Sequence, residues 1–198
     1  MIEISGISVG YKGRTVLKDF SLSIDGHDCI LLKGLNGSGK TTLMKALAGL
    51  LPLSGGSISG ADRIVMVPTR IPKVKGFTLR QFVATSCPDP EAVSRALAAL
   101  GLEELAERDI STLSDGQFQK GCIATGLSRR AGLLLLDEPT AFLDYKARES
   151  VLEVIRGIAD AGTPVIFSSH DIAAALPFAT RVVELPSPEK APSGLDMD

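Results

Sequence analysis

The fold is decided by one glycine-rich stretch, Gly34-Leu35-Asn36-Gly37-Ser38-Gly39-Lys40-Thr41-Thr42. It matches the phosphate-binding loop pattern, with a glycine at the first place and Gly-Lys-Thr near the end. The apolar run at residues 29–32 precedes it and predicts a buried strand, whereas residues 43–50 predict a helix. Strand, glycine loop and helix form the arrangement that binds nucleotide phosphates. The sequence therefore predicts a nucleotide-binding chain.

Each residue type in this loop has a physical purpose. Gly34, Gly37 and Gly39 let backbone N–H groups turn toward phosphate oxygens, and the helix start adds further donors and a partial positive charge. Lys40 would reach the β- and γ-phosphates, and Thr41 would offer its hydroxyl to Mg²⁺. The nucleotide-binding residues predicted in the stretch are Asn36, Gly37, Ser38, Gly39, Lys40, Thr41 and Thr42.

Composition narrows the class of protein. The chain has 198 residues, which suggests a single domain that can bury about 70% of its unfolded surface. The formal net charge of −2 provides no basic field, so no nucleic-acid partner is expected. Three scattered cysteines predict neither a disulfide framework nor a zinc site, and they fit a reducing compartment.

The apolar runs are short. Residues 1–4 lack the pattern of a signal peptide, and runs such as residues 133–136 are far too short to cross a bilayer. We expect a protein that does not span a membrane itself but can lie on one through a partner.

Alternating apolar residues before the loop predict two antiparallel strands, at residues 2–9 and 20–24, with turns at Gly13 and at residues 25–26. Tyr11 ends the first strand and is either a base-stacking aromatic or an ordinary strand tyrosine. Residues 52–57 are rich in Pro, Ser and Gly and predict a loop before a third apolar strand at residues 64–67.

Residues 69–113 change to short helical segments. Thr78 is suited to cap one helix, and Asp89-Pro90-Glu91 has the order of cap, proline and acid that begins another. Apolar residues at helical spacing follow, and Gly101 closes that helix. The segment carries no catalytic pattern, so we interpret it as a helical lobe inserted in an α/β core.

The second half of the chain adds buried strands. Four consecutive leucines at residues 133–136 predict a strand that is buried on both faces, and therefore a parallel sheet. A helix at residues 145–160 and strands at 164–167 and 180–185 follow. The predicted fold is α/β: a P-loop NTPase with a mainly parallel central sheet, an N-terminal antiparallel addition and an inserted helical lobe. We expect a single domain at 1–185, with a core lobe (1–69 and 130–185), a helical lobe (70–129) and a flexible tail (186–198).

Acids and a histidine stand where these strands end. Asp137 would complete a Mg²⁺ site with Thr41 and the phosphate oxygens. Glu138 would polarise an attacking water, and His170 would contact the γ-phosphate side. Lys40, Glu138 and His170 are the predicted catalytic residues.

The order of these motifs resembles the nucleotide-binding subunits of ATP-binding-cassette (ABC) transporters. Leu113-Ser114-Asp115-Gly116-Gln117 is similar to the family signature Leu-Ser-Gly-Gly-Gln, and residues 141–144 also fit the family. The resemblance covers residues 1 to about 185. It implies that two subunits pair head to tail, so that ATP lies between one phosphate loop and Ser114, Gly116 and Gln117 of the other copy. It also implies that Tyr11 stacks on adenine.

Two positions depart from the family pattern. Thr69 stands where the family usually has a glutamine that touches Mg²⁺ or water, and Asp115 replaces a signature glycine. Since a carboxylate repels the γ-phosphate, we expect Asp115 to point away from it. Both departures resemble importers of iron complexes, although the helical lobe here is shorter.

The predicted function is therefore an ATP-binding and ATP-hydrolysing transporter subunit with Mg²⁺, whose cargo is an iron complex. The predicted partners are a second copy or a paired subunit and a transmembrane permease. The predicted location is cytoplasmic, on the inner face of the membrane through that partner. A soluble non-transport ABC ATPase and a weakly hydrolysing regulatory module remain as alternatives.

Overall fold

A five-stranded sheet forms the centre of the protein. The computed structural model describes residues 1–11, 14–69 and 71–186. The strand order is β5 (Ile64–Val67), β6 (Leu133–Leu136), β7 (Val165–Ser168), β3 (Cys29–Lys33) and β8 (Arg181–Glu184). Every pairing in this sheet is parallel. The prediction of a parallel sheet from four consecutive leucines is confirmed.

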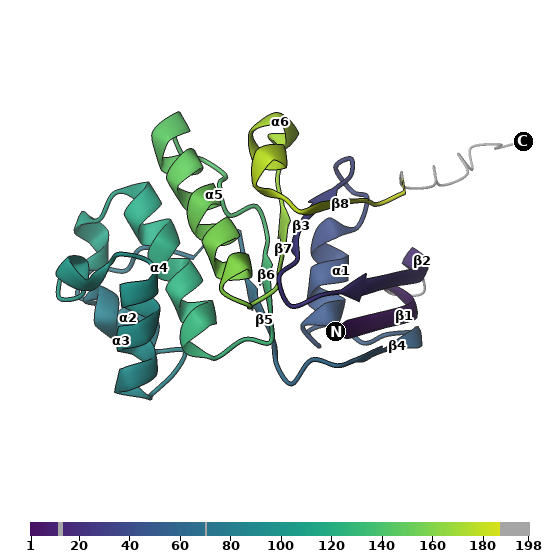
Figure 1. The fold of residues 1–198 in the computed structure, drawn as a ribbon, viewed down its shortest axis with the longest axis horizontal. Coiled ribbons are helices and arrows are strands. Elements are labelled where there is room, and N and C mark those ends of the chain that lie inside the picture. The colour runs from purple at the N-terminus through teal and green to yellow at the C-terminus, as the bar shows by residue number, and fades with distance from the viewer. Residues whose placement is uncertain (12–13, 70, 187–198) are drawn as a thin grey trace, which may run out of the picture.

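This sheet separates two hydrophobic cores. Leu134 and Leu136 of β6 face one core, whereas Leu133 and Leu135 face the other, because successive strand residues point to opposite faces. Helix α1 (Lys40–Leu47) packs in the second core, while α4 (Asp115–Ser128) and α5 (Tyr145–Asp160) pack in the first. Figure 1 shows α1 on one side of the central strands and α4 and α5 on the other.

The N-terminal antiparallel sheet has three strands in the order β2 (Arg14–Ile24), β1 (Ile2–Tyr11) and β4 (Gly55–Ser59). The loop predicted at residues 52–57 is wrong in its second half, since Gly55 begins β4. The reason is that β4 is held by backbone pairing with β1 and lacks an apolar alternation. A Cβ on Gly56 would lie 2.5 Å from the backbone of Gly6, so the close approach of the strands requires glycine. The turn predicted at Gly13 lies outside the described residues.

The inserted segment is helical, as predicted, with α2 (Leu79–Ala84), η1 (Glu103–Leu105) and η2 (Ile110–Thr112) beside α4. Thr78 forms a capping box with Gln81 and begins α2.

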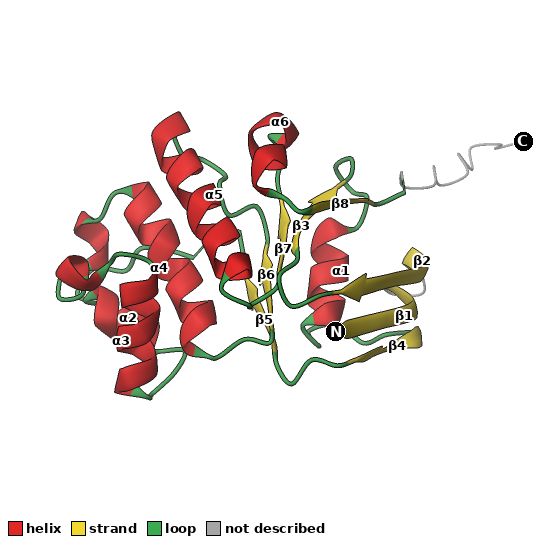
Figure 2. Ribbon diagram, viewed as in Figure 1, coloured by secondary structure: helices red, strands yellow, loops and turns green. Residues whose placement is uncertain are grey.

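Helix α3 (Pro90–Ala99) begins at an Asp89 cap and is followed by Gly101 at φ +64°. Figure 2 shows these helices gathered at one end of the molecule, opposite the antiparallel sheet. The core that covers one face of the central sheet continues into them. The limits assigned to the two lobes stay a prediction.

Beyond β7 lie the short helices α6 (Ile172–Ala175) and η3 (Leu176–Phe178). Within the described part of the chain, no helix combines the length and apolar character needed to span a membrane.

Candidate nucleotide-binding site

The phosphate loop joins β3 to α1, as the sequence predicts. Gly39 precedes the helix at φ +97°, and a Cβ there would lie 2.8 Å from Val16 of β2, so this position needs glycine. Lys40, the first residue of α1, is buried. Its Nζ donates to the carbonyl oxygens of Gly34 (2.7 Å) and Leu35 (3.2 Å). The ammonium group thus lies across the loop, close to where phosphates would enter.

The loop also encloses a hydroxyl that is available to a ligand. Ser38 is buried, and its Oγ makes no hydrogen bond with any described residue. A Cβ on Gly34 would lie only 2.4 Å from this oxygen, so a side chain there would obstruct the cradle. A buried hydroxyl without a partner costs about 1–3 kcal/mol, which a phosphate oxygen would offset. Asn36 and Gly37 are exposed at the tip of the loop, and Thr42 is buried in α1.

The carboxyl ends of three strands converge beside the loop, in a cluster that we call the acid edge: Thr41, Asp137, Glu138, Ser168 and His170. Thr41 Oγ1 donates to Asp137 Oδ2 over 2.9 Å, so the two predicted Mg²⁺ ligands meet. Ser168 Oγ donates to Asp137 Oδ1 (2.9 Å) and accepts from the Glu138 backbone N–H (2.9 Å).

Sequence reasoning missed Ser168. Its signal was a serine as the last residue of a buried strand, beside the strand that ends at Asp137. Ser168 is fully buried, and its single hydroxyl orients both acids.

Glu138 is held in a strained conformation. Its φ of +51° lies in the left-handed region, which a residue with a Cβ rarely adopts. Its Oε2 accepts from the His170 backbone N–H over 3.0 Å, and His170 Nε2 lies 3.5 Å from Oε1. Oε1 is buried and accepts no hydrogen bond from a described residue. This oxygen is positioned to accept a proton from a water.

The electrostatics suit that role. Burial raises the pKa of the Glu138 carboxyl above its ordinary value, while the His170 ring and backbone N–H and the Lys40 ammonium lower it and Asp137 raises it further. A carboxyl with a raised pKa is a stronger base than an exposed one. The histidine ring itself is largely exposed, with 66% of its side-chain surface accessible.

The donor set of the acid edge fits Mg²⁺ with a nucleotide. A threonine hydroxyl and a carboxylate 2.9 Å apart are both hard oxygen ligands, and Mg²⁺ typically takes one or two protein ligands plus phosphate oxygens and waters. Thr41 and Asp137 are the residues that would hold the ion.

The predicted signature residues lie elsewhere, in a segment that we call the signature turn (residues 114–117). Ser114 caps α4: its Oγ accepts from the Gln117 N–H (3.2 Å), and Gln117 Oε1 accepts from the Ser114 N–H (3.0 Å). A Cβ on Gly116 would lie 2.9 Å from Cβ of Ala147 in α5, which explains the need for a small residue. No hydrogen bond or ion pair joins the signature turn to the phosphate loop in residues 1–11, 14–69 and 71–186.

The two remaining positions of interest flank the loop. Tyr11 ends β1 and is 45% exposed, so its ring is accessible, and stacking on adenine stays a prediction. Val67, the last residue of β5, pairs with Leu136, and its carbonyl oxygen accepts from the Asp137 N–H over 3.1 Å. Thr69 follows two positions after this strand end.

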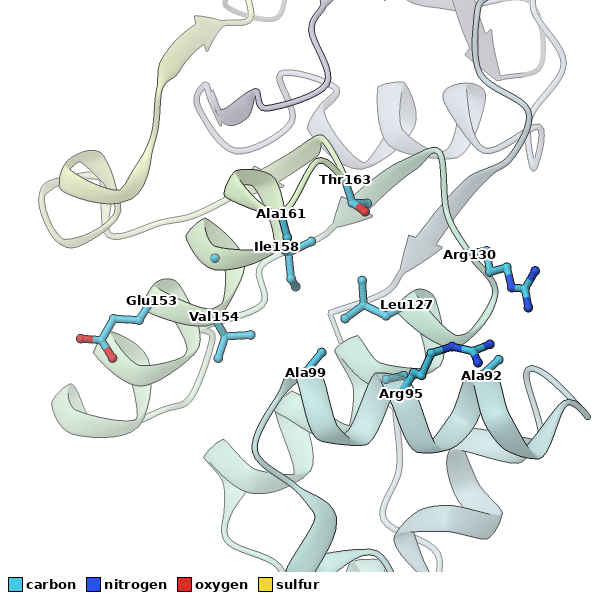
Figure 3. A pocket seen from close by; sticks show the side chains of 12 residues that line it. Ala92, Arg95, Ala99, Leu127, Arg130, Glu153, Val154, Ile158, Ala161 and Thr163 are labelled. Carbon is cyan, nitrogen blue, oxygen red and sulfur yellow. The ribbon is translucent and has the colours of Figure 1, made fainter.

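A separate groove of about 540 Å³ lies between α3 and α5. Figure 3 shows its walls, with Arg95 and Arg130 on one side and Glu153 on the other. Its 12 lining residues include none of the predicted site residues. The groove is therefore separate from the phosphate loop and the acid edge.

A phosphate loop on a parallel sheet, with an acid edge beside it, defines a P-loop nucleotide-binding protein. Residues 17–141 match the family model described as ABC transporter. The chain belongs to the ATP-binding subunits of this family, which are ATPases.

The curated relatives are named for the import of different substrates. The chain is 35% identical to the zinc import ATP-binding protein ZnuC of Ruegeria pomeroyi, over 92% of this chain and 74% of that protein. It is 33% identical to the cobalamin import ATP-binding protein BtuD of Halobacterium salinarum, over 92% of this chain and 52% of that protein. It is 30% identical to the hemin import ATP-binding protein HmuV of Rhodococcus jostii, over 100% of this chain and 75% of that protein.

Solved structures confirm the fold. A nucleotide-free ATP-binding cassette from an ABC transporter has a TM-score of 0.84 at 18% identity, over 93% of this chain and 87% of that chain. The dimeric post-hydrolysis cassette MJ0796, bound to ADP and Pi, has a TM-score of 0.76 at 22% identity, over 96% of this chain and 97% of that chain. The predicted α/β P-loop NTPase architecture is correct.

Proposed function

We propose that this chain hydrolyses ATP to drive import of a metal ion or metal chelate through a membrane-spanning permease, on whose cytoplasmic face it lies. Relatives named for zinc, cobalamin and hemin import support this class of cargo. An iron complex is the narrower proposal, which rests on the departures at Thr69 and Asp115.

The observation that carries the hydrolytic step is the acid edge. Lys40 would bind the β- and γ-phosphates, and Thr41 and Asp137 would hold Mg²⁺, which would supply charge neutralisation at the phosphates. Glu138 accepts the proton of the attacking water at its buried Oε1. The exposed His170 ring, 3.5 Å from Glu138 Oε1, would contact the γ-phosphate side of the nucleotide.

Two copies would share each nucleotide. In the signature turn Ser114 and Asp115 are exposed and Gln117 is half-buried, and the hydroxyl and N–H groups lie at a helix N-terminus, which favours anions. The dimeric relative bound to ADP and Pi supports this arrangement. Ser114, Gly116 and Gln117 of one copy would therefore complete the phosphate loop of the other.

The first experiment measures phosphate release from Mg-ATP by the purified chain. Lys40→Ala should abolish it, because the ammonium group across the loop is lost. Lys45→Ala is the matched control, since Lys45 lies in the last turn of the same helix. Hydrolysis that survives Lys40→Ala would contradict the proposed site.

Sharing of the site is tested by mixing two inactive variants. Ser114→Ala and Lys40→Ala homodimers each lack one half of both sites, whereas the mixed dimer regains one complete site. Recovery of activity on mixing supports the pairing. Full ATPase activity of the Ser114→Ala variant by itself would contradict the shared site.

The transport proposal is tested by affinity purification from native membranes, followed by uptake of radioactive zinc, cobalamin and hemin into cells that lack the chain. Co-purification of a multi-span membrane protein and loss of one uptake support it. Co-purification of a soluble scaffold alone, or ATPase activity near background with the permease present, would instead favour the two alternatives.

A further inference from the structure

The loop between β5 and α2 reaches the signature turn through one side chain. After Thr69 the chain runs to α2, and Lys73 lies in the middle of this connection. Lys73 Nζ donates to Asp115 Oδ1 over 2.7 Å and to the Leu113 carbonyl oxygen over 2.9 Å. It therefore holds both neighbours of Ser114, the cap of α4.

The environment of Lys73 favours a fixed position. Its side chain is only 26% exposed, and its ammonium lies 5.5 Å from the ring centroid of Phe118, which is itself buried. Three interactions thus converge on one amine from residues about 40 positions further along the chain.

The other end of the connection is also anchored. The Gly76 N–H donates to Asp109 Oδ2 (2.7 Å), and the Ile110 N–H donates to the Phe77 carbonyl oxygen (2.9 Å). The end of this loop that leads into α2 is therefore anchored to residues 109–110.

Asp115 makes this contact necessary. A carboxylate in the signature turn would repel the γ-phosphate of the partner copy, and an ammonium at 2.7 Å neutralises it. The side chain of Asp115 is 73% exposed, so solvent weakens the pair, but the hydrogen bond to Leu113 fixes the amine independently of that charge.

We propose that Lys73 is a positioning residue that holds Ser114 in place through its two neighbours and neutralises Asp115. The inference rests on the proposed function, because it assumes that the signature turn meets ATP bound to a second copy. It adds a residue from outside the signature turn that controls the shape and charge of that turn.

The test compares Lys73→Met with Lys75→Met, which removes the same charge two positions away. Lys75 is exposed and makes no hydrogen bond or ion pair in the part of the chain that the structure covers. Methionine removes the charge but places an unbranched apolar side chain of similar length beside the buried Phe118, so the fold should survive.

Lys73→Met should lower kcat about tenfold with little change in KM, the size expected for loss of one charge-assisted hydrogen bond. Lys73→Arg should keep most of the activity. Adding Asp115→Asn to Lys73→Met should restore part of it, because the unneutralised carboxylate is removed. Equal kcat in Lys73→Met and Lys75→Met, or no recovery with Asp115→Asn, would overturn the proposal.

Hydrogen–deuterium exchange of the free protein separates this inference from the proposed function. Lys73→Met should speed exchange of the Gln117 and Phe118 amides, whereas Lys75→Met should not. Unchanged exchange overturns the positioning role even if ATP is hydrolysed. If Lys73→Met speeds this exchange but ATP hydrolysis does not depend on Lys40, the positioning role of Lys73 is supported and only the proposed function is refuted.

Discussion

The acid edge and the signature turn are built in different ways. The acid edge joins residues far apart in the sequence, since Thr41 and Asp137 are 96 positions apart and Asp137 and Ser168 are 31 apart. The signature turn is held by a capping box within residues 114–117 and by Lys73. Asp137, Glu138 and Ser168 of the first are buried, whereas Asp115 in the second is 73% exposed.

The difference indicates which region controls the chemistry of hydrolysis and which controls the pairing of two copies. Hydroxyl and carboxylate groups at the acid edge keep their places because the central parallel sheet aligns three strand ends. The signature turn keeps its shape through a helix cap and the contacts of Lys73, and neither of these involves the sheet. Damage to the acid edge should therefore affect chemistry, and damage to the signature turn should affect pairing and local stability.

The largest expected effect is at the acid edge. Glu138→Gln should reduce kcat by ~10²–10⁴, the usual cost of losing a general base, while nucleotide binding through Lys40 is kept. Single-turnover ATPase and fluorescent-nucleotide titration measure the two quantities. Glu153→Gln, in the groove between α3 and α5, is the control. Parent-level hydrolysis in Glu138→Gln would show that another group takes the proton.

Ser168→Ala should come next. It removes the donor to Asp137 and the acceptor for the Glu138 N–H, so we expect a loss of about 1–3 kcal/mol in stability and about a tenfold lower kcat. Ser128→Ala is the matched control, because Ser128 is also a buried serine but donates only to a carbonyl of its own helix. Chemical denaturation and kcat should separate the two variants. Equal kcat values would mean that Ser168 does not orient the acids.

A smaller effect is expected at the signature turn. Ser114→Ala should cost about 0.5–2 kcal/mol by removing a helix cap. Thr78→Ala removes the same kind of capping box from α2 and should cost a similar amount. Only Ser114→Ala should also lower ATPase activity. If both variants lower it alike, the effect of Ser114 is structural and the comparison between the two regions fails.

The smallest expected effect is a shift in the pH dependence of ATPase activity. Because the pKa of Glu138 is raised, ATPase activity should fall as the pH drops through that value and the base becomes protonated. The His170 ring lowers this pKa, so His170→Ala should move the acid limb of the kcat profile to higher pH. The chain has two histidines, and His27→Ala, which contacts the Ala159 carbonyl, should leave the limb in place. A shift toward lower pH would contradict the electrostatic role of His170.

Features that depend only on residues close together in the sequence were predictable. The helix predicted at residues 145–160 has the observed bounds, and the caps at Thr78 and Asp89 form as expected. Strand β4, Ser168 and Lys73 were not predicted. Each is defined by a contact with a distant part of the chain, and none has a periodicity of its own.

The sequence by itself determined the phosphate loop, the parallel sheet and the order of the motifs, because glycine spacing and unbroken apolar runs act over a few residues. Only the tertiary structure decided how the strand ends meet. It placed Asp137 against Thr41, turned Ser168 between the two acids and brought Lys73 to Asp115. Those contacts join residues that are between 30 and 96 positions apart, and the packing of the sheet and helices, rather than local propensity, brings them together.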